Sequence, residues 1–235
     1  MYPRRTLGLI GGMGPQATQC FYQDIIDNTV ADKDQDHIDM VIINHASMPD
    51  RTSAILSGTT EPVYSRLKND AEKLIKFGVD YIAMPCNTSH YFIDRLKSET
   101  GASFIDMIEE TAILIRKRNI SRVGLMATNG TVMSRIYEIK MKEHGIDIIL
   151  PSEEKQSYVM QIIYDQIKAG IAPDKRMFEE VSRELEDKGA EAVILGCTEL
   201  SYYNKLHNLS EYYFDAQEIL VRKCIELCGG RQERV

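Results

Sequence analysis

The sequence predicts an α/β protein built from two similar lobes, each a parallel β-sheet flanked by helices. Short apolar segments alternate with amphipathic segments along the chain, which is the pattern that repeated βα units produce. Segments of the first half also match segments of the second half at offsets of 116, 111 and 109 residues. Such small drifts are expected of two halves with a common origin, although short βα segments rich in Val, Ile and Gly also match by chance.

The matched segments include two cysteines in similar surroundings. Each cysteine stands eight residues after a glycine, at which a helix is expected to end because glycine adopts the left-handed conformation there. An apolar strand then leads to the thiol. The matched pairs are Leu7-Gly-Leu-Ile-Gly-Gly12 with Val123-Gly-Leu-Met-Ala-Thr128, Gly78-Val-Asp-Tyr-Ile-Ala-Met-Pro-Cys86 with Gly189-Ala-Glu-Ala-Val-Ile-Leu-Gly-Cys197, and Ser103-Phe-Ile-Asp106 with Tyr213-Phe-Asp215.

Strands and helices are expected to alternate from end to end. Continuous apolar runs such as Val41-Ile-Ile are typical of strands that helices cover on both faces. Prolines 15, 62 and 173 are expected in the first turns of helices, where a missing N–H does no harm. The expected strands are Thr6–Gly11, Met40–Asn44, Tyr81–Met84, Ser103–Ile105, Arg122–Met126, Asp147–Leu150, Ala192–Leu195 and Tyr212–Phe214.

The lobe boundary is expected near Gly101. Residues 1–101 would form the first lobe, joined by the C-terminal helix within residues 216–235, and residues 102–215 would form the second. The active site is expected in the cleft between the lobes.

Composition excludes several classes of function. The chain has 235 residues, 43% of them hydrophobic, which is enough for sizeable cores. Its net charge of −7 argues against nucleic acid as a partner, and no apolar run approaches the length of a membrane span. The first five residues lead directly into a predicted strand, so no leader segment is expected. Five cysteines, an odd number without zinc-ribbon spacing, predict reduced thiols and a cytoplasmic location.

The glycine-rich turn Gly11-Gly-Met-Gly-Pro-Gln-Ala17 has three interpretations. It fits the dinucleotide fingerprint, but the second strand ends in Asn44-His45 rather than in an acid that would hold a ribose. Backbone amides at a helix N-terminus would instead hold a carboxylate. A tight turn without a ligand is the third interpretation.

Cys86 and Cys197 are the candidate catalytic residues, because ligands of parallel sheets bind at the carboxyl ends of the strands. Two opposed thiols suit the inversion of a carbon that bears a hydrogen. One thiolate removes the proton from one face, and the other thiol delivers a proton to the opposite face. Asn87, Thr88 and Thr198 follow the thiols, where they would orient the substrate or stabilise its developing charge.

Other cysteines and histidines have simpler interpretations. His90 lies four residues after Cys86, so a zinc site with Cys197 is conceivable, but a hydrogen bond near the helix start is the favoured role. No metal is expected. Cys20, Cys224 and Cys228 are interpreted as small hydrophobic core residues. His45 ends a strand near the expected cleft, where contact with the substrate is conceivable, but a structural role is favoured and His45 is left out of the site.

Five motifs in order resemble the aspartate/glutamate racemase family, most closely its aspartate racemase branch, over nearly the whole chain. They are Gly11-Gly-Met-Gly-Pro-Gln-Ala-Thr18, Met48-Pro-Asp-Arg51-Thr52, Cys86-Asn-Thr-Ser-His90, Ala127-Thr-Asn-Gly-Thr131 and Gly196-Cys-Thr-Glu199. The resemblance implies two pseudo-symmetric lobes, a homodimer, and racemisation of a small acidic amino acid without a cofactor. It also implies that Cys86 and Cys197 are the two acid/base residues.

The resemblance further implies the substrate contacts. Arg51 and Lys168 would hold the two carboxylates, and local positive charge is needed where a dianion approaches a negative protein. Met13 lies in the glycine-rich turn, and Thr128 and Thr131 would add donors.

Glu199 marks a departure, because glutamate racemases follow the second cysteine with Thr-His. Its carboxylate would raise the pKa of Cys197, so that thiol would rest protonated if Glu199 points into the site. Because the Thr-His pair typical of glutamate racemases is missing, aspartate is the expected substrate, with glutamate possible. The alternatives are a catalytically silent protein that binds acidic amino acids, and a decarboxylase or hydantoin racemase of the same superfamily.

Overall fold

The computed structural model describes residues 4–232, and these form two compact units. The first unit runs to Met107 and resumes at Gln217, whereas the second unit is Ile108–Ala216. The lobe boundaries expected from the sequence, with each lobe a domain of its own, remain a prediction.

The first unit contains a parallel sheet with the strand order β2-β1-β3. These strands are β1 (Thr6–Gly11), β2 (Asp39–Asn44) and β3 (Tyr81–Ala83). The strand expected at Ser103–Ile105 is wrong, because this segment makes a single parallel bridge between Ile82 and Phe104. A segment of three residues that is soon followed by a helix is too short for further strand pairing.

The second unit contains a parallel sheet with the order β5-β4-β6-β7. Its strands are β4 (Arg122–Ala127), β5 (Asp147–Ile149), β6 (Ala192–Gly196) and β7 (Tyr213–Asp215). Strand β4 matches β1, β6 matches β3, and β7 takes the place of the bridge at Phe104. The two sheets therefore share one topology, and the predicted α/β fold with two parallel sheets is confirmed.

Helices connect the strands throughout both units. Gly78 and Gly189 follow the last residues of α3 and α9 with φ of 79° and 88°, as the left-handed helix ends predicted from the sequence require. The helices are α1 (Pro15–Asp27), η1 (Asp34–Asp36), α2 (Arg51–Ser57), α3 (Glu61–Lys76), η2 (Asn87–Phe92), α4 (Ile93–Thr100), α5 (Met107–Lys117), α6 (Asn129–Met133), α7 (Ile136–Glu143), α8 (Glu153–Met160), η3 (Gln161–Ile167), α9 (Lys175–Asp187), α10 (Thr198–His207) and α11 (Ala216–Leu227).

Two of the three helix-starting prolines are where the sequence predicts them. Pro15 and Pro62 lie in the first turns of α1 and α3. Pro173 lies outside α9, because Asp174 caps that helix by accepting hydrogen bonds from the backbone N–H groups of Arg176 and Met177.

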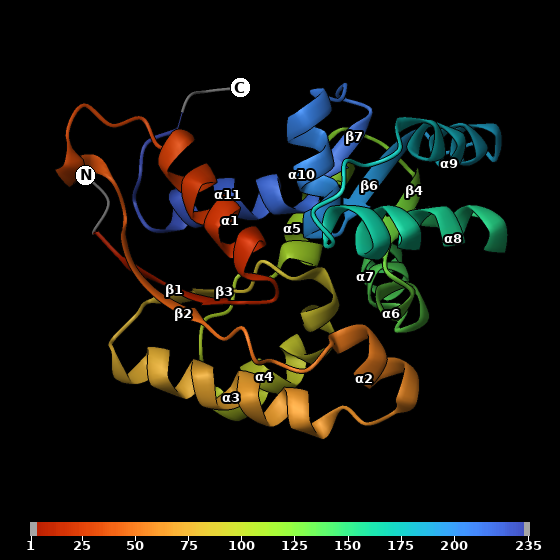
Figure 1. Cartoon of the computed structure of the whole chain (residues 1–235). Coiled ribbons are helices and arrows are strands. Elements are labelled where there is room, and N and C mark those ends of the chain that lie inside the picture. Colours follow the sequence, from red (N-terminus) through yellow and green to blue (C-terminus); the bar gives the residue numbers. More distant parts are fainter. Residues whose placement is uncertain (1–3, 233–235) are drawn as a thin grey trace. The chain divides into compact units, whose positions relative to one another are not determined.

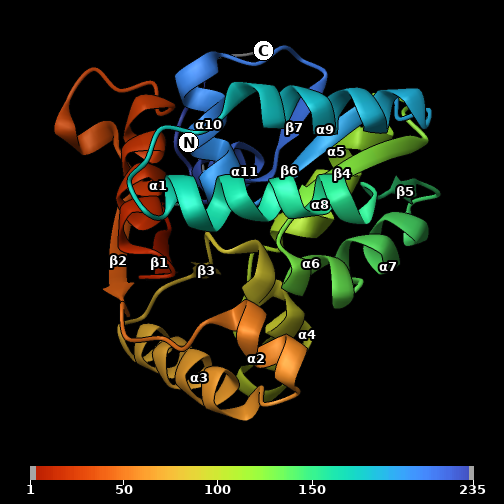
Figure 2. The same ribbon diagram turned by 45° about the vertical axis from the view of Figure 1, so that its right-hand side comes forward.

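Helices cover both faces of the first sheet (Figures 1 and 2). Helices α1 and α11 lie on one side of it, and α3 and α4 lie on the other. Helix α11 belongs to the first unit, where Gln217 at its start donates a hydrogen bond to Asp24 of α1 over 3.1 Å. In the second unit, α8 and α9 lie side by side (Figure 2) and share a core with β6. The central strands are buried, as β6 is throughout, but the edge strand β2 is not: Ile42 is 39% exposed, so the full cover expected for Val41-Ile-Ile is wrong.

Candidate active site

Cys86 lies just beyond the carboxyl end of β3, where it precedes η2. The residue is 6% exposed and packs in an apolar cluster with Met13 and Met84. Its carbonyl oxygen accepts a hydrogen bond from the backbone N–H of Ser89 over 3.1 Å. The thiol is therefore held by a short, backbone-bonded turn at the sheet edge that the sequence predicts.

His90 anchors the backbone of Cys86 rather than its thiol. The ring Nδ1 donates to the carbonyl oxygen of Cys86 over 3.0 Å, and Nε2 accepts from the backbone N–H of Met107 over 3.1 Å. Burial lowers the pKa of His90, although the Asp106 carboxylate opposes this effect. The ring is thus neutral, and the role expected of it near the helix start is confirmed.

Arg51 connects α2 to the glycine-rich turn. Its guanidinium donates to the carbonyl oxygen of Met13 over 3.1 Å and to that of Pro49 over 3.0 Å. The hydroxyl of Ser89 in turn lies 3.3 Å from the Met13 sulfur. The structure therefore brings Met13, Arg51 and the segment after Cys86 together. Asn87 and Thr88 are both buried in this segment.

Cys197 lies at the carboxyl end of β6 and precedes α10. Its thiol donates to a carboxylate oxygen of Glu199 over 2.8 Å, and the Thr198 hydroxyl donates to the same oxygen over 3.2 Å. The Lys168 ammonium lies 4.0 Å from the other oxygen of Glu199. All four predicted residues thus lie in one cluster, with the carboxylate at a helix N-terminus, which favours negative charge.

The electrostatic setting of Cys197 holds the thiol protonated. Burial raises the pKa of Cys197 well above its usual range, and the negative charge of Glu199 raises it further. The positive charge of Lys168 lowers this pKa, but its effect is smaller than those of burial and of Glu199. The thiol of Cys197 is therefore protonated at rest.

Lys168 follows a π-helix that sequence reasoning missed. Residues Gln161–Ile167 form η3, and the N–H of Lys168 donates to the carbonyl oxygen of Ile163 over 3.0 Å, five residues back. The Lys168 ammonium lies 3.9 Å from the centre of the Tyr164 ring. Helical periodicity alone gives no signal for such a wider turn, which often marks functional sites.

Thr128 and Thr131 follow β4, the strand next to the one that precedes the second cysteine. Ala127 of β4 pairs with Gly196 of β6, so Thr128 and Cys197 each follow a paired residue at the same sheet edge. Thr128 caps α6, and its hydroxyl lies 3.1 Å from that of Thr131. Both side chains are buried.

The two cysteines share one form of support that the sequence did not reveal. Ser201 stands four residues after Cys197, as His90 does after Cys86. The Ser201 hydroxyl lies 3.5 Å from the carbonyl oxygen of Cys197 and donates to Asp215 at the end of β7 over 2.7 Å. The residue at this position thus ties each cysteine backbone to the next segment of the sheet edge.

A pair formed by a partly buried histidine and a buried aspartate near the glycine-rich turn was also missed. The Nδ1 atom of His45 lies 2.5 Å from a carboxylate oxygen of Asp70, whose side chain is 0% exposed. A signal existed, because Asp70 occupies the apolar face of α3 between Leu67 and Leu74.

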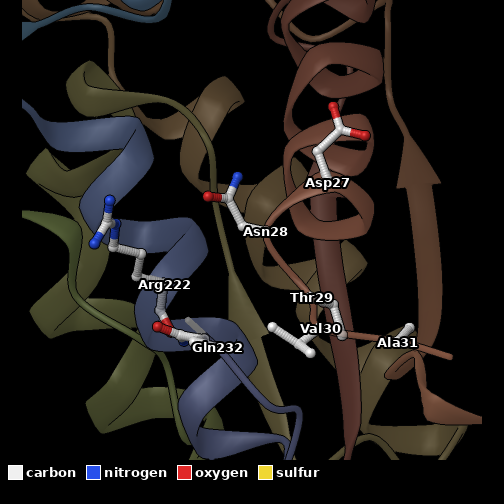
Figure 3. Close-up of a pocket in the computed structure, with 7 residues that line it drawn as sticks. All are labelled: Asp27, Asn28, Thr29, Val30, Ala31, Arg222 and Gln232. Atoms are coloured by element: carbon white, nitrogen blue, oxygen red, sulfur yellow. The ribbon is translucent and has the colours of Figure 1, made fainter. Parts of the chain in front are cut away.

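A cavity of about 310 Å³ lies elsewhere in the first unit, between the end of α1, α11 and the chain after it (Figure 3). Arg222 in its wall is already paired with Glu218 over 2.7 Å. The carbonyl end of α1 and Asp27 disfavour anions there. None of the predicted site residues lines this cavity, so it is a poor candidate for the site.

Within residues 4–232, no three His, Cys, Asp or Glu side chains are grouped so that they could hold a metal ion. No helix in that range has the length and apolar character needed to cross a membrane.

Comparison with known proteins places the chain among racemases. An aspartate racemase from Picrophilus torridus has 31% identical residues and a TM-score of 0.81, with 97% of this chain and 96% of that chain covered. An aspartate racemase homologue from Pyrococcus horikoshii OT3 has 27% identity and a TM-score of 0.78, covering 96% and 99%. The broad specificity amino-acid racemase RacX of Bacillus subtilis (strain 168) is 28% identical over 204 residues, which are 83% of this chain and 86% of RacX.

The family model of Asp/Glu/Hydantoin racemases matches residues 10–224 of this chain. That range contains all five motifs and both cysteines. The resemblance noted from the motifs is therefore confirmed, and the chain belongs to the Asp/Glu/Hydantoin racemase family.

Proposed function

We propose that this amino-acid racemase inverts the α-carbon of an acidic amino acid, with aspartate preferred and glutamate possible, by proton transfer between Cys86 and Cys197 without a cofactor. The observation that carries the proposal is the matched placement of the two thiols. Each follows an equivalent strand of its sheet, precedes a helical segment, and has its carbonyl oxygen contacted by the residue four positions later.

The proposed reaction needs one thiolate and one thiol on opposite faces of the substrate. The thiolate takes the α-proton and becomes a thiol, and the electron pair left on the α-carbon takes the proton of the other thiol. Cys197 donates in the resting enzyme, because burial and Glu199 raise its pKa. Cys86 is then the base. The reverse reaction starts from the exchanged protonation states.

Substrate binding in this proposal draws on both units. Arg51 and Lys168 hold the two carboxylates, and both already lie beside groups of the site, the Met13 carbonyl and Glu199 respectively. The remaining contacts to the substrate come from Met13, Asn87, Thr88, Thr128, Thr131 and Thr198. The N-terminal amides of α10 stabilise charge that develops on the α-carboxylate during proton removal.

The preference for aspartate is supported by the relatives. The similar Picrophilus torridus protein is named as an aspartate racemase, and RacX as a broad specificity enzyme. The site lies in a cleft between the two lobes in this proposal, and the enzyme works as a cytoplasmic homodimer. The cleft and the homodimer follow from the family resemblance, and the cytoplasmic location follows from the odd number of cysteines.

The test is proton NMR of L-aspartate and L-glutamate incubated with the purified protein in deuterated buffer. The α-hydrogen signal of the preferred acid is expected to disappear with the wild-type protein. Cys86→Ser and Cys197→Ser should each reduce inversion at least about 100-fold, because each removes one of two obligatory acid/base groups. Cys20→Ser is the matched control, since this cysteine lies in α1.

Each contrary outcome has a defined meaning. Unchanged exchange in both cysteine variants would exclude the two-thiol mechanism. Binding of aspartate by the wild-type protein without any exchange would favour a catalytically silent binding protein. Release of carbon dioxide, or turnover of a hydantoin alone, would indicate the other members of the superfamily.

A further inference from the structure

His45 lies at the carboxyl edge of the first sheet, beside the glycine-rich turn. It directly follows β2, and its backbone N–H donates to the carbonyl oxygen of Gly11 over 3.1 Å. Gly12 has φ of +87°, and a Cβ atom there would lie 2.4 Å from the His45 backbone. Only glycine permits this approach. The position of His45 is therefore fixed against the turn that carries Met13.

The loop that starts at His45 also carries Arg51. The backbone N–H of Met48 donates to the His45 carbonyl oxygen over 3.1 Å, and Arg51 donates to the Met13 carbonyl oxygen at the other end of the loop. His45 and Arg51 thus contact the same turn from two ends of one short segment. A carboxylate bound above Gly12 and Met13 would lie within reach of both side chains.

The His45 ring is oriented by a buried carboxylate. Nδ1 bonds to one oxygen of Asp70, and the Lys73 ammonium lies 3.0 Å from the other oxygen. Asp70 is fully buried, whereas the His45 side chain is 20% exposed. Nε2 makes no hydrogen bond to any residue among 4–232. A carboxylate that fixes one ring nitrogen and leaves the other for a ligand is the usual way to present a histidine to a substrate.

Strand order sets the distance between His45 and Cys86. Strands β2 and β3 flank β1, so their ends lie two strand spacings apart, about 10 Å. Gly12 follows the central strand and contributes no side chain to that interval. A thiol, a four-carbon diacid and an imidazole together span such a gap, with the α-carbon of the diacid at the thiol and its side chain toward His45.

We propose that His45, held by Asp70, binds the side-chain carboxylate of the substrate through Nε2 and sets the preference for acidic over neutral amino acids. This inference rests on the proposed function, because it adds a contact to the carboxylate that Arg51 holds. With a carboxylate at each nitrogen, both ring nitrogens act as hydrogen-bond donors in the complex.

Two substitutions separate the two ring nitrogens. His45→Asn keeps a donor for Asp70 at the Nδ1 position and removes Nε2, whereas His45→Gln keeps a donor near the Nε2 position. His144→Gln is the matched control, because His144 also pairs with a carboxylate, Glu109, over 2.9 Å, and its side chain is 23% exposed.

The measurements are dissociation constants of L-aspartate and L-asparagine by calorimetry, with kcat and KM for α-hydrogen exchange. His45→Asn should weaken aspartate binding about 10-fold or more, the effect of one hydrogen bond to a charged group, and change asparagine binding less than about 2-fold. Its kcat should stay within about 3-fold. His45→Gln should lose less affinity, and the His144 variant none.

Several outcomes would overturn the assignment of His45. One is unchanged aspartate affinity in His45→Asn. Another is an equal loss for aspartate and asparagine with a lower melting temperature, which would mean a structural role. Binding of aspartate by the wild-type protein without exchange would refute racemisation, while the variants would still test His45. A wild-type protein that binds neither amino acid would refute the inference itself.

Discussion

The two thiols differ at the level of single residues, although their backbones are held alike. Cys86 packs among apolar side chains, including Met13 and Met84. The Cys197 thiol instead donates a hydrogen bond to the Glu199 carboxylate and keeps its proton. A two-base reaction needs this difference, because two thiols in the same protonation state would not provide one donor and one acceptor.

Replacing Glu199 with Gln should lower the pKa of Cys197. The substitution removes a negative charge next to the thiol, so the thiolate becomes easier to form and the pKa moves down. Alkylation of Cys197 by iodoacetamide, followed by mass spectrometry of its peptide, should therefore begin at lower pH in the variant. Racemisation should fall about 10-fold or more, because the donor is no longer held protonated.

Glu179→Gln controls for the loss of one negative charge. Glu179 lies in α9, where it pairs with Lys175 at a half-exposed position, so the alkylation profile of Cys197 should not move. A Glu199→Gln profile that coincides with the wild-type profile would show that burial alone keeps the thiol protonated.

The sequence predicts those site residues that lie in one local motif, but not those that only the folded chain brings together. Cys86 and Cys197 were found because each lies within three residues after the end of a strand, and their neighbours belong to the same motifs. His45 and Asp70 are 25 residues apart and meet only when α3 packs on the sheet. No local pattern records such a contact, apart from the charged residue on an apolar helix face.

Most elements could be predicted because apolar runs and glycine ends define them locally. Strand β1 begins and ends where the sequence predicts, and the other six strands differ by a residue or so at an end. The failures have local causes. Ser103–Ile105 is too short for more than one bridge, and Pro173 lies before the first turn of α9 because Asp174 caps that helix.

Gly12 should tolerate alanine much less well than Gly58 does. Both have positive φ, +87° and +72°, but only Gly12 has backbone atoms within 2.4 Å of the added Cβ, while Gly58 faces open space. Gly58→Ala should cost about 1 kcal/mol for the left-handed conformation. Gly12→Ala adds a backbone clash and should cost more than about 3 kcal/mol in the free energy of unfolding.

Urea unfolding of the two variants measures this difference directly. The Gly58→Ala variant carries only the penalty for the left-handed conformation. Subtracting its loss of unfolding free energy from that of Gly12→Ala therefore gives the cost of the clash with the His45 backbone. Equal midpoints for the two variants would mean that the loop beginning at His45 moves aside freely, and would remove the argument that its position is fixed.

At the scale of the whole molecule, the chain path makes the second unit an insertion in the first. The chain leaves the first unit at Met107 and returns at Gln217 with α11. Leu220, Val221 and Ile225 of this helix are 0% exposed, and each contributes roughly 2 kcal/mol by its burial. The backbone N–H of Arg5 also donates to the carbonyl oxygen of Cys228 over 3.4 Å. The first unit is therefore incomplete until the last residues of the chain have been made.

This path predicts unequal behaviour of the separated parts. Residues 106–216 expressed alone should unfold cooperatively, because they contain the whole second sheet and its helices. Residues 1–107 alone should not, since α1 is left without α11 on its side of the sheet and part of that face is exposed. Co-expression with residues 216–235 should restore a cooperative transition, measured by circular dichroism in urea. If residues 1–107 unfolded at the same urea concentration with and without the C-terminal segment, α11 would not be part of that core, and the order in which the two units form would no longer follow from the chain path.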